Sequence, residues 1–252
     1  MAPWPIIVAA GLSIGLLLGL FGVGGSSVAT PVLSLLGVPG LLAVASPLPA
    51  TIPAALLAAR PYLRDGEARP KAAAWSLLGS IPATIVGALL SRVVGAGPLL
   101  VGSGVVLFLV GVRVIRPIDE AARTVGEARR QNRLLLVECA AGVGLFTGLL
   151  ANGGGFLLVP LYLLVFGLGM RAAVGTSLIV TAALSIPTLA THWALGHIDW
   201  TIAFAFAAGL LPGSVAGSHL ARRIAGASLR RAFGWFLIGF GAFFTIFRLL
   251  HP

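Results

Sequence analysis

Two glycine clusters interrupt apolar stretches of this sequence, and each is followed by a proline. The first is Gly22-Val23-Gly24-Gly25-Ser26-Ser27, ahead of Pro31, and the second is Ala151-Asn152-Gly153-Gly154-Gly155, ahead of Pro160. Glycine is a poor helix former, so each cluster predicts a helix break. Backbone that leaves a helix inside lipid must line a cavity or contact a ligand, because unpaired N–H groups are costly in hydrocarbon. We therefore interpret the two breaks as two halves of one substrate site.

The chemistry that such breaks favour is anion binding. A helix that begins at a break points unpaired N–H groups and the positive end of its dipole into the cavity. Glycine allows an anion to approach the backbone closely, and hydroxyl or amide side chains add donors. The predicted substrate-binding residues at the breaks are Gly24, Gly25, Ser26, Ser27, Asn152, Gly153, Gly154 and Gly155. The alternative is that these glycines only permit close helix packing, as small residues do in membranes.

Hydroxyl residues on the segments that follow the breaks extend this candidate site. They are Ser46, Thr51, Thr176, Ser177 and Thr181. Each can line the cavity or can bond back to a carbonyl of its own helix, which is a common habit of such side chains. Pro47, Pro49 and Pro53 indicate an irregular helix start just after Ser46.

Three ionisable residues are candidates for coupling or gating. Glu138 can carry a coupling proton or can pair with a loop arginine at the interface. His192 and Asp199 flank a predicted outer loop, where a titrating group can gate or steer a substrate. The alternative for His192 is that it anchors the interface together with Trp193 and Trp200.

The composition is that of a polytopic protein of the plasma membrane. Of 252 residues, 58% are hydrophobic and only 10% are charged, and the mean hydropathy is +1.04. The net charge of +10 fits cytoplasmic loops and anionic lipid head groups, so we expect no nucleic-acid partner. A single cysteine, Cys139, excludes an internal disulfide, and no spacing indicates a metal site, so no cofactor is expected.

Apolar segments predict the order of the helices. They run over 5–22, 28–37, 41–59, 72–91, 98–116, 134–151, 156–167, 172–194, 200–221 and 232–250. Segments 28–37 and 156–167 are too short to cross a bilayer and predict broken or re-entrant half-helices. Residues 117–133 form the one long polar connection. The fold expected is all-α, with about eight transmembrane helices and two half-helices.

An internal repeat relates the two halves of the chain, 1–116 and 134–252, across the linker 117–133. Gly15 matches Gly144 and Pro31 matches Pro160 at a spacing of 129. After a one-residue insertion the spacing becomes 130, and the matches then include Thr51 with Thr181, Gly79 with Gly209, and Arg92 with Arg222. A register held over most of each half predicts two structural repeats.

The charges predict that the repeats are inverted. If each glycine-interrupted pair, 5–37 and 134–167, enters and leaves on one side, fifteen of the seventeen Lys and Arg residues face one side of the membrane. If each pair crosses once, only eleven do. The positive-inside rule prefers the first model, with both termini outside and the linker in the cytoplasm. Inverted repeats with interrupted helices at the midplane are typical of secondary transporters.

The sequence resembles the sulfite exporter (TauE/SafE) family of membrane permeases. The motifs that carry the resemblance are GLLLGLFGVGGSSVATPVLSLLG over 15–37, GLFTGLLANGGGFLLVPLYLLVFG over 144–167, the runs 43–48 and 173–178, and Gly196-x-Ile198-Asp199-Trp200. The resemblance implies a bundle of two inverted repeats that moves small sulfur-containing anions such as sulfite, sulfonates or thiosulfate. Pro47 stands where the second repeat has Ser177, so the first repeat offers one hydroxyl fewer.

Two other function classes remain as alternatives. An integral membrane enzyme needs acids, bases or metal ligands at one depth, whereas Glu138, His192 and Asp199 are scattered along the chain. A permease for a metal ion is disfavoured because carboxylates are few and only one methionine besides the initiator is present. The partners expected are a small anion and membrane lipid, with a coupled proton or ion as a further candidate.

Overall fold

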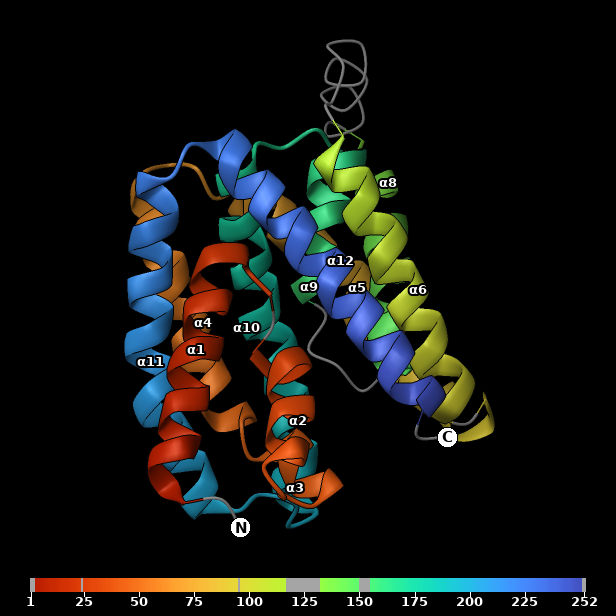
Figure 1. Ribbon diagram of the computed structural model, residues 1–252. Coiled ribbons are helices and arrows are strands. Elements are labelled where there is room, and N and C mark those ends of the chain that lie inside the picture. The colour runs from red at the N-terminus through yellow and green to blue at the C-terminus, as the bar shows by residue number, and fades with distance from the viewer. Residues whose placement is uncertain (1–2, 24, 95, 117–131, 150–154, 251–252) are drawn as a thin grey trace. The chain divides into compact units, whose positions relative to one another are not determined.

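The computed structural model describes residues 3–23, 25–94, 96–116, 132–149 and 155–250, and every regular element in them is a helix. The helices are α1 Trp4–Phe21, α2 Gly25–Leu35, α3 Gly40–Ala45, α4 Leu48–Arg64, α5 Pro70–Val94, α6 Ala96–Ile115, α8 Arg133–Leu149, α9 Gly155–Pro160, the π-helix η1 Leu161–Val165, α10 Met170–Ala194, α11 Trp200–Arg223 and α12 Gly226–Leu250 (Figure 1).

The predicted apolar segments all correspond to helices, with two informative differences. Segment 41–59 is divided at Ser46 and Pro47 into α3 and α4. The helix after the first glycine cluster begins at Gly25 rather than at residue 28, so Pro31 lies inside α2. Because proline has no N–H, this position loses one helical hydrogen bond, the one that the Ser27 carbonyl would accept.

Four helices in the described residues are long and apolar enough to span a membrane. They are Trp4–Phe21, Leu41–Arg64, Met170–Ala194 and Trp200–Arg223, and Gly104–Ile115 and Phe156–Val165 are shorter apolar helices. Large apolar side chains such as Leu78, Phe204 and Trp235 are exposed on the helices. Such faces suit lipid rather than water. The chain is therefore a multi-pass membrane protein.

The chain divides into two compact units, each built from both halves of the sequence. Unit 1 contains residues 1–73, 153–156 and 174–223, and unit 2 contains residues 74–152, 157–173 and 224–252. Neither unit coincides with one half of the sequence, because each takes helices from before and after the polar linker.

In unit 1, α1 packs along α11 with the two backbones in contact (Figure 1). A Cβ atom added to Gly15 would collide with the carbonyl oxygen of Leu210. Cβ atoms on Gly209 and Gly217 would collide with carbonyl oxygens of α1 in the same way. Glycines spaced four residues apart lie on one face of a helix, so this interface depends on the absence of side chains.

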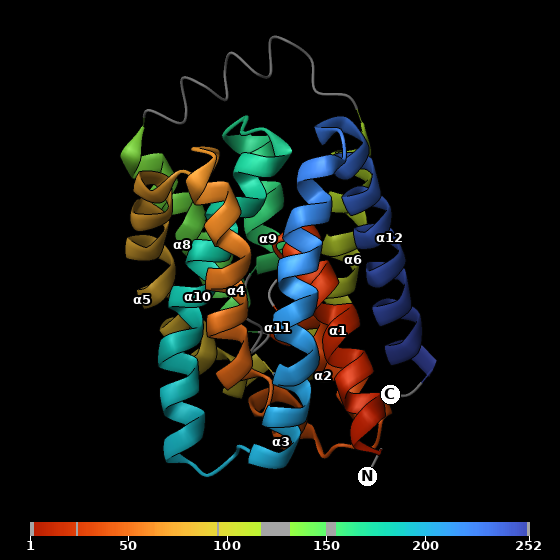
Figure 2. The ribbon, with the colours of Figure 1, turned by 90° about the vertical axis from the view of Figure 1, so that its left-hand side faces the viewer.

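Unit 2 contains two further pairs of closely packed helices, α6 with α12 and α5 with α8 (Figure 2). A Cβ atom on Gly241 of α12 would lie 2.6 Å from the carbonyl oxygen of Gly104 in α6. A Cβ atom on Gly79 of α5 would collide with the backbone of Val137 in α8, and one on Gly87 would collide with that of Leu145. Close backbone packing at small residues therefore stabilises each unit internally.

We expect Gly15→Ala to destabilise the protein by about 1–3 kcal/mol, because the added methyl group meets backbone of α11 that can move only if the helices separate. The matched control is Gly142→Ala on the exposed face of α8, where a Cβ atom has nothing within 4 Å. This control should be neutral or stabilising by about 0.5–1 kcal/mol, since alanine is the better helix former. Thermal unfolding of the purified protein measures both. Equal stability of the two variants would contradict this packing.

Candidate functional site

The first glycine cluster ends one helix and begins another inside unit 1. Gly22 adopts the left-handed conformation, with φ of 66°, and its N–H donates to the carbonyl of Leu18. This conformation is open to glycine at little cost and ends α1 at Phe21. Gly25, Ser26 and Ser27 form the first turn of α2. Gly24 and the side chains of Ser26 and Ser27 lie outside what the structure describes.

Two side chains bind the carbonyl groups at the end of α1. The Tyr62 hydroxyl donates to the Gly19 carbonyl at 3.1 Å. The Ser177 hydroxyl donates to the Gly22 carbonyl at 3.3 Å and to the Val174 carbonyl at 2.9 Å. The last carbonyls of a helix lack helical partners, and in lipid they cannot turn to water. Tyr62 and Ser177 therefore stabilise the break itself.

Tyr62 is a site residue that the sequence did not indicate. It lies near the end of α4, is fully buried, and packs against α10 at Gly175. A Cβ atom on Gly175 would lie 2.6 Å from the Tyr62 Cβ atom, so this glycine makes room for the tyrosine. The only signal in the sequence was a polar aromatic residue at the end of an apolar segment, which usually indicates an interface anchor.

Two of the predicted hydroxyls accept hydrogen bonds from backbone N–H groups that lie just before a helix. The backbone N–H of Asp199, just before α11, donates to the Ser46 hydroxyl at 3.1 Å. The backbone N–H of Arg69, just before α5, donates to the Thr176 hydroxyl at 3.0 Å. Ser46 and Thr176 are fully buried, and their oxygens satisfy N–H groups that have no partner within a helix.

Thr51 and Thr181 occupy equivalent positions in the sequence but make different hydrogen bonds. Both are fully buried. The Thr51 hydroxyl donates to the Pro47 carbonyl at 3.0 Å, within its own helix. The Thr181 hydroxyl has no hydrogen-bond partner among the residues that the structure describes. A buried hydroxyl without a partner costs about 1–3 kcal/mol, so Thr181 is the predicted residue best placed to accept a ligand.

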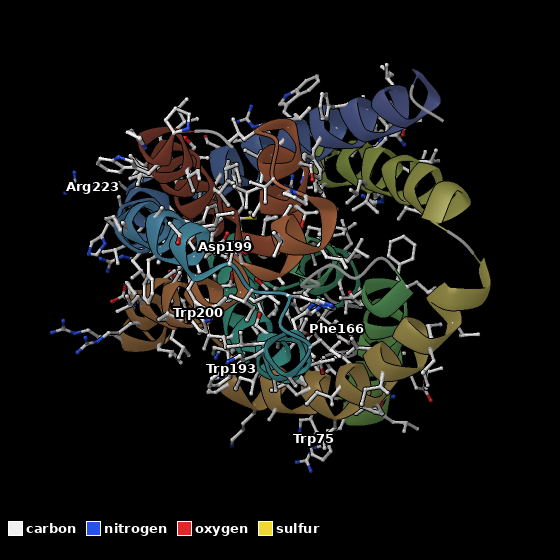
Figure 3. All side chains as sticks on the ribbon, turned by 90° about the horizontal axis from the view of Figure 1, so that it is seen from below. Trp75, Phe166, Trp193, Asp199, Trp200 and Arg223 are labelled. Atoms are coloured by element: carbon white, nitrogen blue, oxygen red, sulfur yellow. The ribbon has the colours of Figure 1, made fainter. Side chains whose placement is uncertain are left out.

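His192 lies near the end of α10, and Asp199 lies just before α11, where its backbone bonds Ser46. His192 and His197 approach each other with 3.3 Å between their Nδ1 atoms. The Asp199 carboxylate accepts the N–H groups of Thr201 at 2.9 Å and Ile202 at 3.2 Å and so caps α11. Figure 3 shows Asp199, Trp193 and Trp200 at the end of unit 1 where α10 leads into α11, and the two indole rings meet edge to face.

Two further charged residues are Glu138, the third coupling or gating candidate, and Arg222, which matches Arg92 in the repeat. Glu138 is exposed on α8. Arg222 lies near the end of α11 and forms an ion pair with Asp65, with 2.8 Å between Nη1 and Oδ2. This pair joins the ends of α4 and α11 within unit 1, where both side chains are partly exposed.

The second glycine cluster is described only at its end. Asn152, Gly153 and Gly154 lie outside the described residues, and Gly155 is the first residue of α9. The helix continues beyond Pro160 as the π-helix η1. No group of three or more His, Cys, Asp or Glu side chains that could hold a metal ion occurs in the described part of the chain.

Comparison with known proteins supplies the family. The model of the family "Sulfite exporter TauE/SafE" matches residues 7–244. The chain is 26% identical over 242 residues to "Probable membrane transporter protein YunE" of Bacillus subtilis, covering 87% of this chain and 89% of that protein. It is 27% identical to a "Probable membrane transporter protein" of Xylella fastidiosa, covering 96% and 95%.

No solved structure matches the chain. The relatives are named as transporters rather than as enzymes. A family model that covers almost the whole chain, together with a multi-pass helical fold, settles the assignment: the protein is a probable membrane transporter and belongs to the sulfite exporter TauE/SafE family.

Proposed function

We propose that this protein is a secondary transporter of small sulfur-containing anions, such as sulfite, sulfonates or thiosulfate. The observation that carries the proposal is the break between α1 and α2, where a helix begins at Gly25 inside unit 1. The N–H groups of its first turn suit an anion. Nearby on α10, Ser177 binds the Gly22 carbonyl, and Thr181, one helical turn further along, has a hydroxyl without a partner among the described residues.

The binding site proposed comprises both glycine clusters and the hydroxyls near them. Donors in it are backbone N–H groups, hydroxyls and the Asn152 amide, with no arginine or lysine. Neutral donors favour transport over tight binding, because an ion pair in a medium of low dielectric resists release. Ser46, Thr176 and Ser177 act in this proposal as positioning residues, since each of their hydroxyls is bonded to backbone.

Helix contacts support the proposal that the two halves are structural repeats. In unit 1 the backbone contacts join Gly209 to Val8 and Gly217 to Leu16. In unit 2 they join Gly79 to Val137 and Gly87 to Leu145. The two sets are related by the spacings of the repeat. Gly79 precedes Gly209 by 130 residues, and Val137 follows Val8 by 129. The same spacings relate Gly87 to Gly217 and Leu145 to Leu16. The α1–α11 pair and the α5–α8 pair therefore pack in the same way. In the first pair these glycines belong to the second half of the sequence, and in the second pair they belong to the first half.

The change of spacing from 129 to 130 has a structural counterpart. Pro160 still matches Pro31 at 129, whereas Gly167 matches Gly37 at 130. Between them lies the π-helix η1, while α2 continues as an ordinary α-helix. A π-turn accommodates one additional residue in an α-helix. The left-handed glycines also recur at 130, as Gly37 with Gly167 and Gly66 with Gly196.

Inverted orientation and alternating access complete the proposal. The bonds from Arg69 to Thr176 and from Asp199 to Ser46 are equivalent at the spacing of 130, and each crosses from one half of the sequence to the other. In an inverted repeat such equivalent contacts lie on opposite sides of the membrane, and opening one side while closing the other moves the substrate. Both termini lie outside in this proposal, and the linker 117–133 is cytoplasmic.

Thr181→Val tests the hydroxyl without a partner. The substitution keeps the shape of the side chain and removes a buried polar group, so the thermal unfolding temperature should stay equal or rise. If this hydroxyl binds the anion, the concentration of sulfite or simple sulfonate for half-maximal transport in proteoliposomes should increase about tenfold. Thr51→Val is the matched control and should change transport much less. A Thr181→Val protein that transports like the wild type would remove Thr181 from the site.

Asn152→Leu and Gly154→Leu test the second glycine cluster. Each places an apolar side chain where the proposal requires close approach of an anion, so transport of every sulfur oxyanion should fall by about tenfold or more. The control is Gly142→Leu on the exposed face of α8, which should transport normally. Unchanged transport in both cluster variants would exclude the second cluster from the site.

A further inference from the structure

A row of hydroxyl side chains lies within unit 2 and belongs to neither glycine cluster. Ser76, Ser80 and Thr84 recur every four residues on α5 and so share one face of that helix. The Tyr162 hydroxyl, from η1, donates to the Ser76 hydroxyl at 2.7 Å. The Thr84 hydroxyl bonds the Ser80 carbonyl at 2.7 Å and the Gly144 carbonyl of α8 at 3.1 Å. With Thr147, one turn further along α8, these five residues form the hydroxyl cluster.

Two members of the hydroxyl cluster are buried without partners. Ser80 is 0% and Thr147 is 3% exposed, and neither hydroxyl bonds any residue that the structure describes. Helices α5 and α8 touch at Ser80, because a Cβ atom on Gly144 would meet the backbone of Ser80. Ser80 lies about 15 Å from the start of α5 and Thr147 about 21 Å from the start of α8, so neither lies at the first turn of its helix. Such groups are costly unless a ligand satisfies them.

Close helix packing of this kind does not require hydroxyls at the positions of Ser76, Ser80 and Thr147. At the equivalent positions of the α1–α11 pair, Phe206 replaces Ser76, Leu210 replaces Ser80 and Leu18 replaces Thr147. All three are fully buried. At the position equivalent to Thr84, unit 1 keeps a buried hydroxyl, that of Ser214. The same backbone packing is thus made in unit 1 with apolar side chains at the two positions where unit 2 has hydroxyls without described partners. The π-turn that carries Tyr162 is likewise confined to one repeat, and such turns are frequent at functional sites.

The chemistry of the hydroxyl cluster suits a cation better than an anion. None of its five side chains is charged, and the protons of Tyr162 and Thr84 are already donated to oxygen atoms, whereas those of Ser80 and Thr147 are not. All five oxygens keep lone pairs, so acceptors outnumber available protons in the hydroxyl cluster. Neutral hydroxyl and carbonyl oxygens are ligands for hard cations, and irregular helices in transporters coordinate Na⁺ in this way.

We propose that the hydroxyl cluster of unit 2, around Ser80 and Thr147, binds a small monovalent cation of the size of Na⁺. This inference deepens the proposed function, because a bound cation reduces the net charge that moves with an anion. Its site is nevertheless distinct in residues and in chemistry from the glycine clusters, so it can be tested without any anion.

The test is thermal unfolding of the purified full-length protein in NaCl, KCl and choline chloride at constant ionic strength. Wild-type protein should gain a saturable increase in unfolding temperature with Na⁺ that choline does not give and K⁺ gives more weakly. Ser80→Ala and Thr147→Val should weaken the apparent Na⁺ affinity about tenfold or more, since each removes one oxygen ligand. Thr147→Ser keeps the hydroxyl and should retain the Na⁺ response.

The matched control is Ser218→Ala in α11, a fully buried serine whose hydroxyl donates to its own helix at Val215. It should respond to Na⁺ as the wild type does. The proposal is wrong if Na⁺ stabilises the wild type no more than choline, or if Ser80→Ala and Thr147→Val retain the full response. A shift in stability that is equal in all three salts would mean that the hydroxyls bind only water, and this also contradicts it.

The two proposals fail separately. A Na⁺ response that disappears in Ser80→Ala, together with no transport of any sulfur oxyanion, would exclude the proposed substrate and leave the cation site. Transport of sulfite with no Na⁺ response would exclude the cation site and leave the proposed substrate.

Discussion

The structure depends on how backbone groups at a helix end are satisfied inside a membrane. A break between α1 and α2 leaves carbonyl groups at the end of one helix and N–H groups at the start of the next. Carbonyls are satisfied here by side chains from two other helices, Tyr62 of α4 at Gly19 and Ser177 of α10 at Gly22. The N–H groups at Gly25 and beyond are those that the proposed function assigns to an anion. The same constraint thus explains both the helices around the break and its chemistry.

Close backbone packing between helices from different halves of the sequence is the second principle of the fold. The closely packed pairs α1–α11, α5–α8 and α6–α12 each take one helix from either side of the polar linker. Lipid tails are as apolar as leucine, so burial of leucine gives little preference for one partner over another. Glycines that allow backbone contact do give such a preference. Neither half of the chain can therefore complete its packing without the other.

Much of the fold could be predicted because it follows from local patterns. Apolar length gave the helix order, and the first glycine cluster correctly indicated where α1 ends. The division of segment 41–59 at Pro47 was also indicated by the local prolines. The roles of Ser46 and Thr176 were not, because their partners, Asp199 and Arg69, lie more than a hundred residues away. Tyr62 was missed for a similar reason, since its bond to Gly19 exists only after α4 packs against α1.

The central claim is that the α1–α2 break binds an anion, and thiol labelling tests it most directly. Because Cys139 is the only cysteine, a Cys139→Ser background allows a single reporter, Ser26→Cys, at the first turn of α2. A small sulfonate such as methanesulfonate should slow labelling of this thiol, while the uncharged dimethyl sulfone should not. Labelling of Ser13→Cys in the middle of α1 should respond to neither compound. Equal labelling of Ser26→Cys with and without the sulfonates and other sulfur oxyanions would contradict the account.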